Sequence, residues 1–343
     1  MGVLHETIAE AQDPERASTE ENIFGTRDPE SIAAIIERLC REQLSDEVCG
    51  AEFYKISVGA VIGLSLASHR DVVVKAYQRR WRPSFLAGVQ RVQRTVGAEL
   101  PCARPISPPV LLTPGGDRYA VVESCLPDPG MEPLTSPSAL RVSAHGLARQ
   151  IALCEGLPEA EALRSHPLRR PPDGLYPEPH SLHFDFDASS VGAEWIDGLA
   201  RRAVEISDED ASGEVVGHTD WSARNVRFDE ERLLAVYDWD SVAFARESTV
   251  VGQAGIVWRV TSEPGGLDFP DIEEFAAYLD EYQAASGRPL TARQRRAAGA
   301  AAVYLLAYIA RCEHALVFAG SRTSTPCPGT DRLGESADDL LSL

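Results

Sequence analysis

The chain begins with two stretches of different pattern. Residues 1–27 are polar and show no apolar period, which predicts a mobile N-terminal arm. A helix is predicted directly after it, because Asp28 can cap the start and Pro29 suits the first helical position. The apolar residues of this helix recur at helical spacing, at Ile32, Ile35, Ile36 and Leu39.

From residue 53 onward, short apolar runs typical of β-strands replace that period. They lie at 53–61, 72–77, 110–113 and 119–124, with a Pro-Gly-Gly-Asp turn between the last two. One short helix, over 84–96, separates the two pairs of runs. Residues 126–136, rich in proline, glycine and acid, are typical of a linker between lobes. The pattern therefore predicts a sheet lobe with a leading helix over 28–125, followed by this linker.

Beyond the linker the apolar pattern is mainly helical. Helices are predicted over 137–154, 191–206, 271–286 and 291–316, interrupted by a proline-rich stretch at 166–180 and by one strand pair near 215–242. An antiparallel sheet lobe followed by a larger, mainly helical lobe over 137–319 is an α+β, bilobed arrangement. Residues 320–343 are expected to form a C-terminal tail.

Length and charge narrow the classes of function. With 343 residues and a net charge of −19, the chain lacks the overall basic character of nucleic-acid binders and of proteins that dock on anionic membranes. The charge divides unevenly, at −9 over 1–52, +4 over 53–135 and −14 over 136–343. A middle segment that is cationic favours an anionic ligand such as a nucleotide, and the last segment favours a cationic one.

The cellular setting is predicted from three smaller features. The longest apolar run, 297–310, is shorter than a membrane span and is typical of a buried core helix. The first residues show no targeting pattern. Seven scattered cysteines without metal-binding spacing indicate reduced thiols, and hence a cytoplasmic protein. The sequence leaves the oligomeric state open.

The most informative stretch runs from His218 to Asp240. Its first part has the spacing His-x-Asp220, four residues, then Asn225. If the polar residues 229–232 form a turn between strands 226–228 and 233–237, Asn225 lies opposite Val236 and Asp238 is its diagonal neighbour. Two oxygen-bearing side chains at one mouth of a hairpin can share Mg²⁺, which completes its shell with phosphate and water.

Two further side chains complete the candidate chemistry. Asp220 lies just before the hairpin mouth, where it can orient an attacking hydroxyl or accept its proton. Lys75 stands in the apolar run Val-Val-Val-Lys-Ala and is one of only two lysines in the chain, the other being Lys55. A buried lysine needs an anion, and a triphosphate is a natural partner.

In order and spacing these motifs resemble the aminoglycoside phosphotransferase family, small-molecule phosphotransferases of the bilobed, protein-kinase-like fold, over about residues 50–316. The resemblance implies that Lys75 contacts the nucleotide phosphates, that Asp220 is the catalytic aspartate, and that Asn225 and Asp238 hold Mg²⁺. ATP or GTP is the implied nucleotide. Its purine is expected at backbone groups of Glu123, Ser124 and Cys125, and its phosphates near Ser57 and Gly59.

The chain departs from the family pattern at three places. The helix 84–96 has no acid to pair with Lys75, although Gln90 or Gln93 can substitute as a neutral partner. The loop with Gly59 and Gly63 is not a Gly-x-Gly-x-x-Gly. The residues after Asp240 lack the Gly-Asp-Pro segment usual in the family.

The acceptor is expected to be a small molecule with a hydroxyl group, and the acidic last segment favours a cationic one. Candidates are antibiotics, such as aminoglycosides, macrolides or nucleosides, or metabolites such as choline, homoserine or sugars. Asp240 is a candidate on the acceptor side, and so are Asp271 and Glu274 in the acid-rich segment 268–281. Such a segment is also typical of a solvated helix face.

Two readings outside this class remain. The run Val-Tyr-Asp238-Trp-Asp240 also resembles the first motif of haloacid-dehalogenase-type phosphatases, but the 103 residues that follow Asp240 contain no lysine and no further βαβ pattern. A nucleotide-binding pseudokinase on the same fold is the other reading. The complete set of Lys75, Asp220, Asn225 and Asp238 favours the enzyme.

Overall fold

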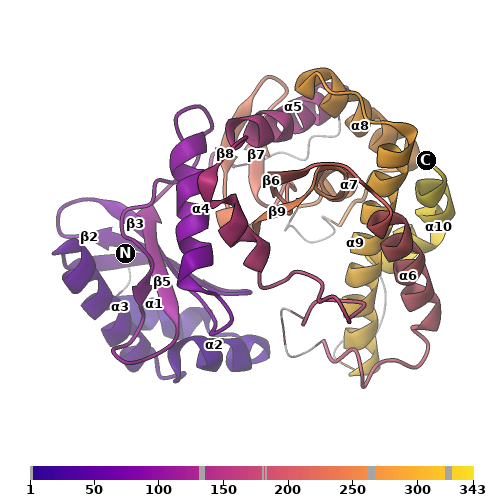
Figure 1. Ribbon diagram of the computed structural model, residues 1–343. Coiled ribbons are helices and arrows are strands. Elements are labelled where there is room, and N and C mark those ends of the chain that lie inside the picture. Colours follow the sequence, from indigo (N-terminus) through magenta and orange to yellow (C-terminus); the bar gives the residue numbers. More distant parts are fainter. Residues whose placement is uncertain (1–2, 131–135, 180, 182–183, 262–266, 321–326) are drawn as a thin grey trace.

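The computed structural model describes residues 3–130, 136–179, 181, 184–261, 267–320 and 327–343. These residues form two lobes, a sheet lobe from the first third of the chain and a larger, mainly helical lobe from the remainder (Figure 1). The predicted bilobed α+β fold is confirmed. The prediction for residues 131–135, within the expected linker, lies outside the described residues, as does that for residues 321–326.

The N-lobe is built on one antiparallel sheet of five strands in the order β1-β2-β3-β5-β4. The strands are β1 (Val48–Ile56), β2 (Ala60–Leu66), β3 (Asp71–Ala76), β4 (Val110–Leu111) and β5 (Tyr119–Ser124). The apolar run 53–61 therefore spans two strands and the turn between them. Helix α4 (Pro83–Val96) covers the face of the sheet toward the C-lobe (Figure 1). This register places Lys75 opposite Val121 in the centre of the sheet.

The described part of the expected mobile arm is helical, so that prediction is wrong. Helices α1 (Leu4–Ala11) and α2 (Ala17–Phe24) flank a short turn, η1 (Pro14–Arg16), and precede α3 (Pro29–Leu44). Leu4, Ile8, Ile23 and Phe24 are buried in the same core as the outer face of the sheet. Each of these two short helices contributes only two buried apolar residues, which is too few to show a helical period in the sequence. Together the four residues cover the sheet.

The start of α3 is as expected, since the Asp28 carboxylate accepts a hydrogen bond from the Ser31 amide. Buried Glu20 of α2 also ties this layer to the sheet, because its carboxylate accepts a hydrogen bond from the Tyr54 hydroxyl at 2.6 Å. The N-terminal helices are thus part of the N-lobe.

The C-lobe contains α5 (Pro137–Leu153), η2 (Pro158–Ser165), α6 (Glu194–Asp208), α7 (Glu247–Val257), α8 (Ile272–Ser286), α9 (Ala292–Phe318) and α10 (Pro328–Ser342). Two small sheets carry the motif residues, β6 (Glu214–His218) with β9 (Val242–Arg246), and β7 (Val226–Phe228) with β8 (Leu233–Val236). Between β8 and β9 lies η3 (Trp239–Ser241). The single strand pair expected near 215–242 is therefore two pairs.

Two C-lobe helices differ from expectation. Helix α7 went unrecognised because it is apolar on all sides, as befits a helix enclosed by its neighbours. Helix α10 lies in the expected C-terminal tail, and the described part of that prediction is wrong, since Leu333, Leu340 and Leu341 are buried against the lobe.

Helix α9 is long and apolar enough to cross a membrane, by length and composition. It packs against α6, α7 and α10, and 56% of its most apolar window is buried inside the structure. This burial is typical of a core helix.

Candidate active site

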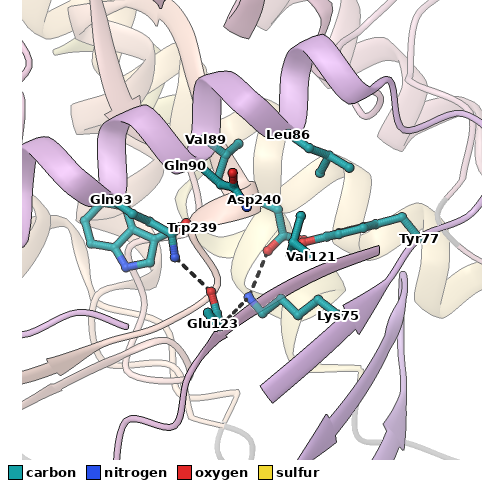
Figure 2. Close-up of a pocket in the computed structure, with 10 residues that line it drawn as sticks. All are labelled: Lys75, Tyr77, Leu86, Val89, Gln90, Gln93, Val121, Glu123, Trp239 and Asp240. Carbon is teal, nitrogen blue, oxygen red and sulfur yellow. Dashed lines mark hydrogen bonds and ion pairs between the residues drawn. The ribbon is translucent and has the colours of Figure 1, made fainter. Parts of the chain in front are cut away.

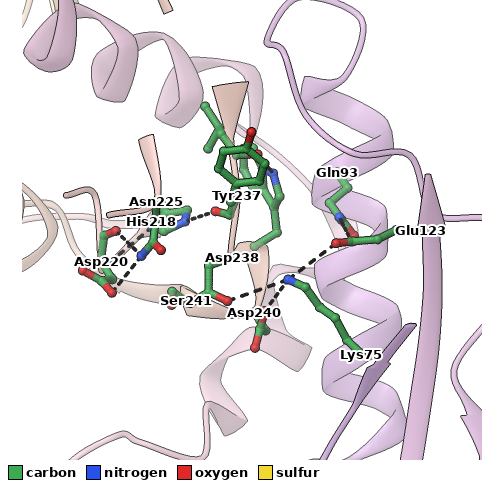
Figure 3. Close-up of polar contacts among 12 residues, drawn as sticks. Lys75, Gln93, Glu123, His218, Asp220, Asn225, Tyr237, Asp238, Asp240 and Ser241 are labelled. Atoms are coloured by element: carbon green, nitrogen blue, oxygen red, sulfur yellow. Dashed lines mark hydrogen bonds and ion pairs between the residues drawn. The ribbon is translucent and has the colours of Figure 1, made fainter. Parts of the chain in front are cut away.

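The motif from His218 to Asn225 begins at the last residue of β6, and two of its side chains hold the Asp220 carboxylate, one of them Asn225 (Figure 3). One carboxylate oxygen accepts a hydrogen bond from the Ser222 hydroxyl at 3.0 Å. The other accepts from Asn225 Nδ2 at 2.8 Å. Both neighbours restrict the rotamer of this carboxylate.

His218 ties this loop to the strand that precedes Asp238. Its Nδ1 accepts a hydrogen bond from the Asp220 amide, so Nε2 carries the proton and donates to the Tyr237 carbonyl at 3.0 Å. Trp221 and Trp239 pack edge-on against the ring. Burial lowers the pKa of His218, which keeps the ring neutral and this connection intact near neutral pH.

The hairpin at the mouth differs from the expected register by one residue. Val226 faces Val236, and the Tyr237 amide donates to the Asn225 carbonyl at 2.7 Å, so Asn225 lies opposite Tyr237. The expected register holds only next to the turn, where Phe228 pairs with Leu233. An irregularity between Arg227 and Phe228 then shifts the pairing by one residue at the mouth of the hairpin.

Asp238 adopts a left-handed backbone conformation, with φ of 56°. This conformation is uncommon outside glycine, asparagine and aspartate, and it lies where the chain leaves β8 and buries Trp239. The Ser241 hydroxyl donates to the Asp238 carboxylate at 3.1 Å. A local backbone distortion thus presents this carboxylate to the N-lobe.

Lys75 reaches from β3 into a group of three carboxylates (Figures 2 and 3). Its Nζ lies 3.1 Å from Asp240, 3.6 Å from Glu123 and 3.7 Å from Asp238. Lys75 is 8% exposed. One cation buried among three acids leaves the group with an excess of negative charge.

The pKa shifts follow from this imbalance. Burial, and then the charge of Asp240, raises the pKa of Asp238 to about 7. Burial alone would raise the pKa of Asp240, but Lys75 outweighs it and holds that pKa below its ordinary value. Burial likewise opposes the charge on Lys75, but Asp240 and Glu123 raise its pKa well above the ordinary range. Lys75 is therefore charged, and Asp238 lacks a cation of its own.

A divalent metal ion fits this arrangement. No cluster of three or more His, Cys, Asp and Glu suitable for a metal occurs within the described parts of the chain. Asn225 donates through Nδ2 to Asp220, which leaves its Oδ1 for a cation, and Asp238 supplies a carboxylate. Few hard oxygen ligands, with phosphate and water to complete the shell, are what Mg²⁺ uses.

The segment expected to receive the purine is partly engaged in the sheet. The Ser124 amide donates to the Arg104 carbonyl at 2.9 Å, and the Cys125 amide donates to the Asp71 carbonyl at 3.1 Å. The side chain of Glu123 points away from this edge, toward Lys75 and α4 (Figure 2). The predicted purine contact is therefore limited to backbone groups of this segment other than the amides of Ser124 and Cys125.

Ser57 and Gly59 lie in the turn between β1 and β2, where the Ser57 amide donates to the Gly59 carbonyl. A Cβ at Gly59 would lie 2.8 Å from the Ala76 carbonyl oxygen, so close packing of this turn on β3 already requires glycine. Gly63 faces Phe53, and a Cβ there would lie 2.4 Å from the ring. Packing accounts for both glycines without a phosphate.

The residues expected on the acceptor side have other partners. Asp240 contacts Lys75 of the N-lobe, and its carbonyl accepts a hydrogen bond from His166. Asp271 caps α8 by accepting from the Glu274 amide, and the Glu274 carboxylate pairs with Arg259 at 2.8 Å.

Most of the acid-rich segment is neutralised in the same way. Asp268 pairs with Arg259, Asp280 pairs with Arg295, and Glu281 contacts Arg141. The segment therefore has the character of an ion-paired helix face.

Gln93 of α4, expected as a neutral partner of Lys75, instead donates to Glu123 at 2.8 Å. Two residues that shape the site were not predicted. The Thr219 hydroxyl donates to the Ser241 carbonyl at 2.6 Å, and His166 lies against Asp240 between the lobes. Neither of these two residues carried a signal in the sequence.

The comparisons with known proteins bear on the fold. No protein-family model and no curated protein sequence matches this chain. Among solved structures, it is similar to an amicoumacin kinase in complex with AMP-PNP, Ca²⁺ and Ami, with a TM-score of 0.57, 9% identity and coverage of 85% of this chain and 87% of that one.

It is also similar to a spectinomycin phosphotransferase in complex with ADP and spectinomycin, with a TM-score of 0.56, 11% identity and coverage of 90% and 98%. An ethanolamine kinase from Plasmodium vivax has a TM-score of 0.55, 9% identity and coverage of 95% of both chains. At these identities the likeness establishes the kinase-like fold, and it confirms the resemblance to the aminoglycoside phosphotransferase family at that level.

Proposed function

We propose that this protein is an O-phosphotransferase that moves the γ-phosphoryl group of ATP or GTP to a hydroxyl group of a small molecule. The convergence of Asp220, Asn225, Asp238 and Lys75 between the two lobes carries the proposal (Figure 3). This set combines a candidate base, a metal site and a phosphate contact. The neighbours in complex with nucleotide support the same chemistry for this fold.

The side chains divide the work. Asp220, fixed by Ser222 and Asn225, orients the acceptor hydroxyl and can take up its proton. Lys75 neutralises the phosphates, and Asn225 with Asp238 would hold Mg²⁺. The bound metal would supply positive charge to the phosphoryl group being transferred. Since phosphoryl transfer asks little covalent chemistry of the protein, positioning and charge provide the catalysis.

The acceptor is proposed to be an antibiotic with a free hydroxyl, which would make the protein a resistance enzyme. Neighbours named for amicoumacin and spectinomycin support this class. A metabolite kinase is the second candidate, favoured by the similarity to an ethanolamine kinase. The ion pairs of the 268–281 segment argue against that segment as a cation pocket, so a cationic acceptor rests on the −14 charge of residues 136–343 alone.

A cytoplasmic location is part of the proposal, supported by the buried free thiols of Cys40, Cys102, Cys154 and Cys312. Cytoplasmic ATP and Mg²⁺ would then be at hand.

One experiment tests the function directly. The purified protein is incubated with γ-labelled ATP or GTP, with and without Mg²⁺, against a panel of hydroxylated antibiotics, ethanolamine, choline, homoserine and sugars. We expect label transfer to at least one neutral or cationic acceptor, dependent on the metal and lost in Asp220→Asn. Labelling of no acceptor while nucleotide still binds would support the pseudokinase reading instead. Activity that persists in Asp220→Asn would contradict the assigned site.

A further inference from the structure

Helix α4 faces Lys75 but offers it no acid. In the kinase-like fold a lysine on β3 pairs with a glutamate on the helix that follows, and the helix position then controls the pair. Here α4 contains no Asp or Glu, and it turns Gln90 and Gln93 toward the sheet (Figure 2). Gln90 donates to the Ser107 carbonyl at 2.7 Å and is thereby engaged elsewhere.

The acid comes from the neighbouring strand. Val73 faces Glu123 in the pairing of β3 with β5, and Lys75 faces Val121, so Glu123 is the diagonal neighbour of Lys75 on the same face of the sheet. Its two carboxylate oxygens have different partners. Oε1 lies 3.6 Å from Lys75 Nζ, and Oε2 accepts from Gln93 Nε2 at 2.8 Å.

Glu123 is buried, at 8% exposed, and so is Gln93, at 4%. A carboxylate this deep is costly unless a cation and hydrogen-bond donors compensate it, and here Lys75 and Gln93 do so. The cavity that these residues line has a volume of about 10 Å³, enough for about one water molecule. The packing therefore holds the Glu123 carboxylate on Lys75.

We propose that the Glu123 side chain positions Lys75 and takes the place of the helix glutamate. Gln93 of α4 supports it as an uncharged hydrogen-bond donor to the Glu123 carboxylate. This role rests on the proposed function, in which Lys75 meets the nucleotide phosphates. It differs from a contact between the Glu123 backbone and a purine.

The competition for Lys75 explains why such a residue is needed. Asp238 and Asp240 attract the ammonium toward the C-lobe, while Glu123 is its acidic partner from the N-lobe among the described residues. Glu123 and Lys75 belong to adjacent strands of one sheet, so their pairing does not depend on the position of α4. The lysine is thereby held in place before nucleotide arrives.

The test exchanges the two side chains that face each other. Glu123→Gln removes the carboxylate. The double variant Gln93→Glu with Glu123→Gln places a carboxylate on α4 instead and keeps the number of non-hydrogen atoms. Glu123→Asp keeps the charge at shorter reach, and Glu52→Gln, an exposed acid on β1, is the matched control. Melting temperatures verify that each variant folds.

Two readouts report on Lys75. Because the chain has only two lysines, ¹³C-labelled lysine gives one side-chain NMR signal for Lys75 and one for exposed Lys55. Affinities for the nucleoside triphosphate and for the nucleoside alone separate contact with phosphate from contact with the base.

We expect Glu123→Gln to shift the Lys75 signal and not that of Lys55. Triphosphate affinity should fall about 10-fold, as for a lost charge-assisted contact, with nucleoside affinity unchanged. The double variant should restore most of the original Lys75 signal and of the triphosphate affinity, and Glu52→Gln should change neither. A Lys75 signal that is unchanged in Glu123→Gln, or a loss that the exchange does not restore, would overturn the proposal. If the wild type binds no nucleotide, the proposed function fails, while the lysine signals still decide the pairing.

Discussion

The two halves of the candidate site are built in different ways. In the C-lobe, Asp220, Asn225 and Asp238 come from one short stretch of chain, and local hydrogen bonds orient them. In the N-lobe, Lys75 depends on Glu123 from another strand and on Gln93 from a helix. Residues that come from one short stretch can be recognised in a sequence by their spacing. Residues that meet across a sheet can be recognised only when the register of the strands is known. The comparison predicts that the C-lobe half sets turnover and the N-lobe half sets nucleotide affinity.

The largest effect is expected from Asp220→Asn. The amide keeps the size of the side chain and can still bond Ser222 or Asn225, but it cannot accept a proton. Turnover should fall by about 10²- to 10⁴-fold, the usual contribution of a general base. Nucleotide affinity, measured by calorimetry, should stay the same because the half with Lys75 is untouched.

Ser222→Ala is the control for that variant, since it removes one orienting hydrogen bond and leaves the carboxylate. Its turnover should fall less than in Asp220→Asn. Equal losses in the two variants would mean that orientation, and not proton acceptance, is what Asp220 provides.

The next effect tests the other half, with Lys75→Met. Methionine fills a similar volume without charge, and it leaves Glu123, Asp238 and Asp240 without their cation. Triphosphate affinity should fall at least about 10-fold, as expected for a lost ion contact to phosphate. A fluorescent nucleotide titration measures this.

Lys75→Arg distinguishes charge from shape. Arginine keeps the charge but carries it on a larger, planar group, so it should not reproduce the contacts of the Lys75 ammonium with Asp240, Glu123 and Asp238 or restore affinity. Full recovery in Lys75→Arg would show that the site needs only a cation, and that the network around Glu123 is dispensable.

What could be predicted follows the same division. Spacing alone pointed to Asp220, Asn225 and Asp238 as candidate site residues, and periodicity placed α4, α5, α8 and α9 within about two residues of their ends. The hairpin register was wrong by one residue, because an irregularity between Arg227 and Phe228 has no signature in a short polar turn.

Contacts between distant segments were beyond the sequence. Glu123 was assigned a backbone role because nothing local shows that β5 lies beside β3, with Glu123 diagonal to Lys75. The N-terminal helices were missed for a related reason. Leu4 and Ile8 are an unremarkable pair until the sheet that they cover is known.

His166 lies between the two halves and gives a pH-dependent prediction. Its Nδ1 accepts from the Leu168 amide, so Nε2 donates to the Asp240 carbonyl at 3.1 Å, while Trp81 and Phe85 pack against the ring. Burial lowers the pKa of His166 to about 4. The unfolded chain binds a proton near pH 6.5, so the folded state is favoured above that pH and loses stability as pH falls toward 4.

The loss assigned to His166 should reach about 3 kcal/mol across that range, from the difference between the two pKa values. Urea unfolding at several pH values measures it. His166→Gln should flatten the slope between pH 6.5 and 4, whereas His69→Gln, at an exposed histidine, should not. An unchanged slope in His166→Gln would show that other groups govern acid unfolding.

The smallest effect concerns Gly63, a glycine within strand β2 of the N-lobe. In Gly63→Ala the new Cβ would lie 2.4 Å from the Phe53 ring, and forcing the ring aside should cost about 1–3 kcal/mol of stability. Nucleotide affinity should not change, because packing within the sheet, and not a phosphate, explains this glycine. Phe53→Leu provides room for the methyl group, so the double variant should regain most of the loss. A drop in triphosphate affinity that Phe53→Leu does not reverse would instead place Gly63 beside the nucleotide, and the N-lobe half would then contain a locally encoded phosphate contact after all.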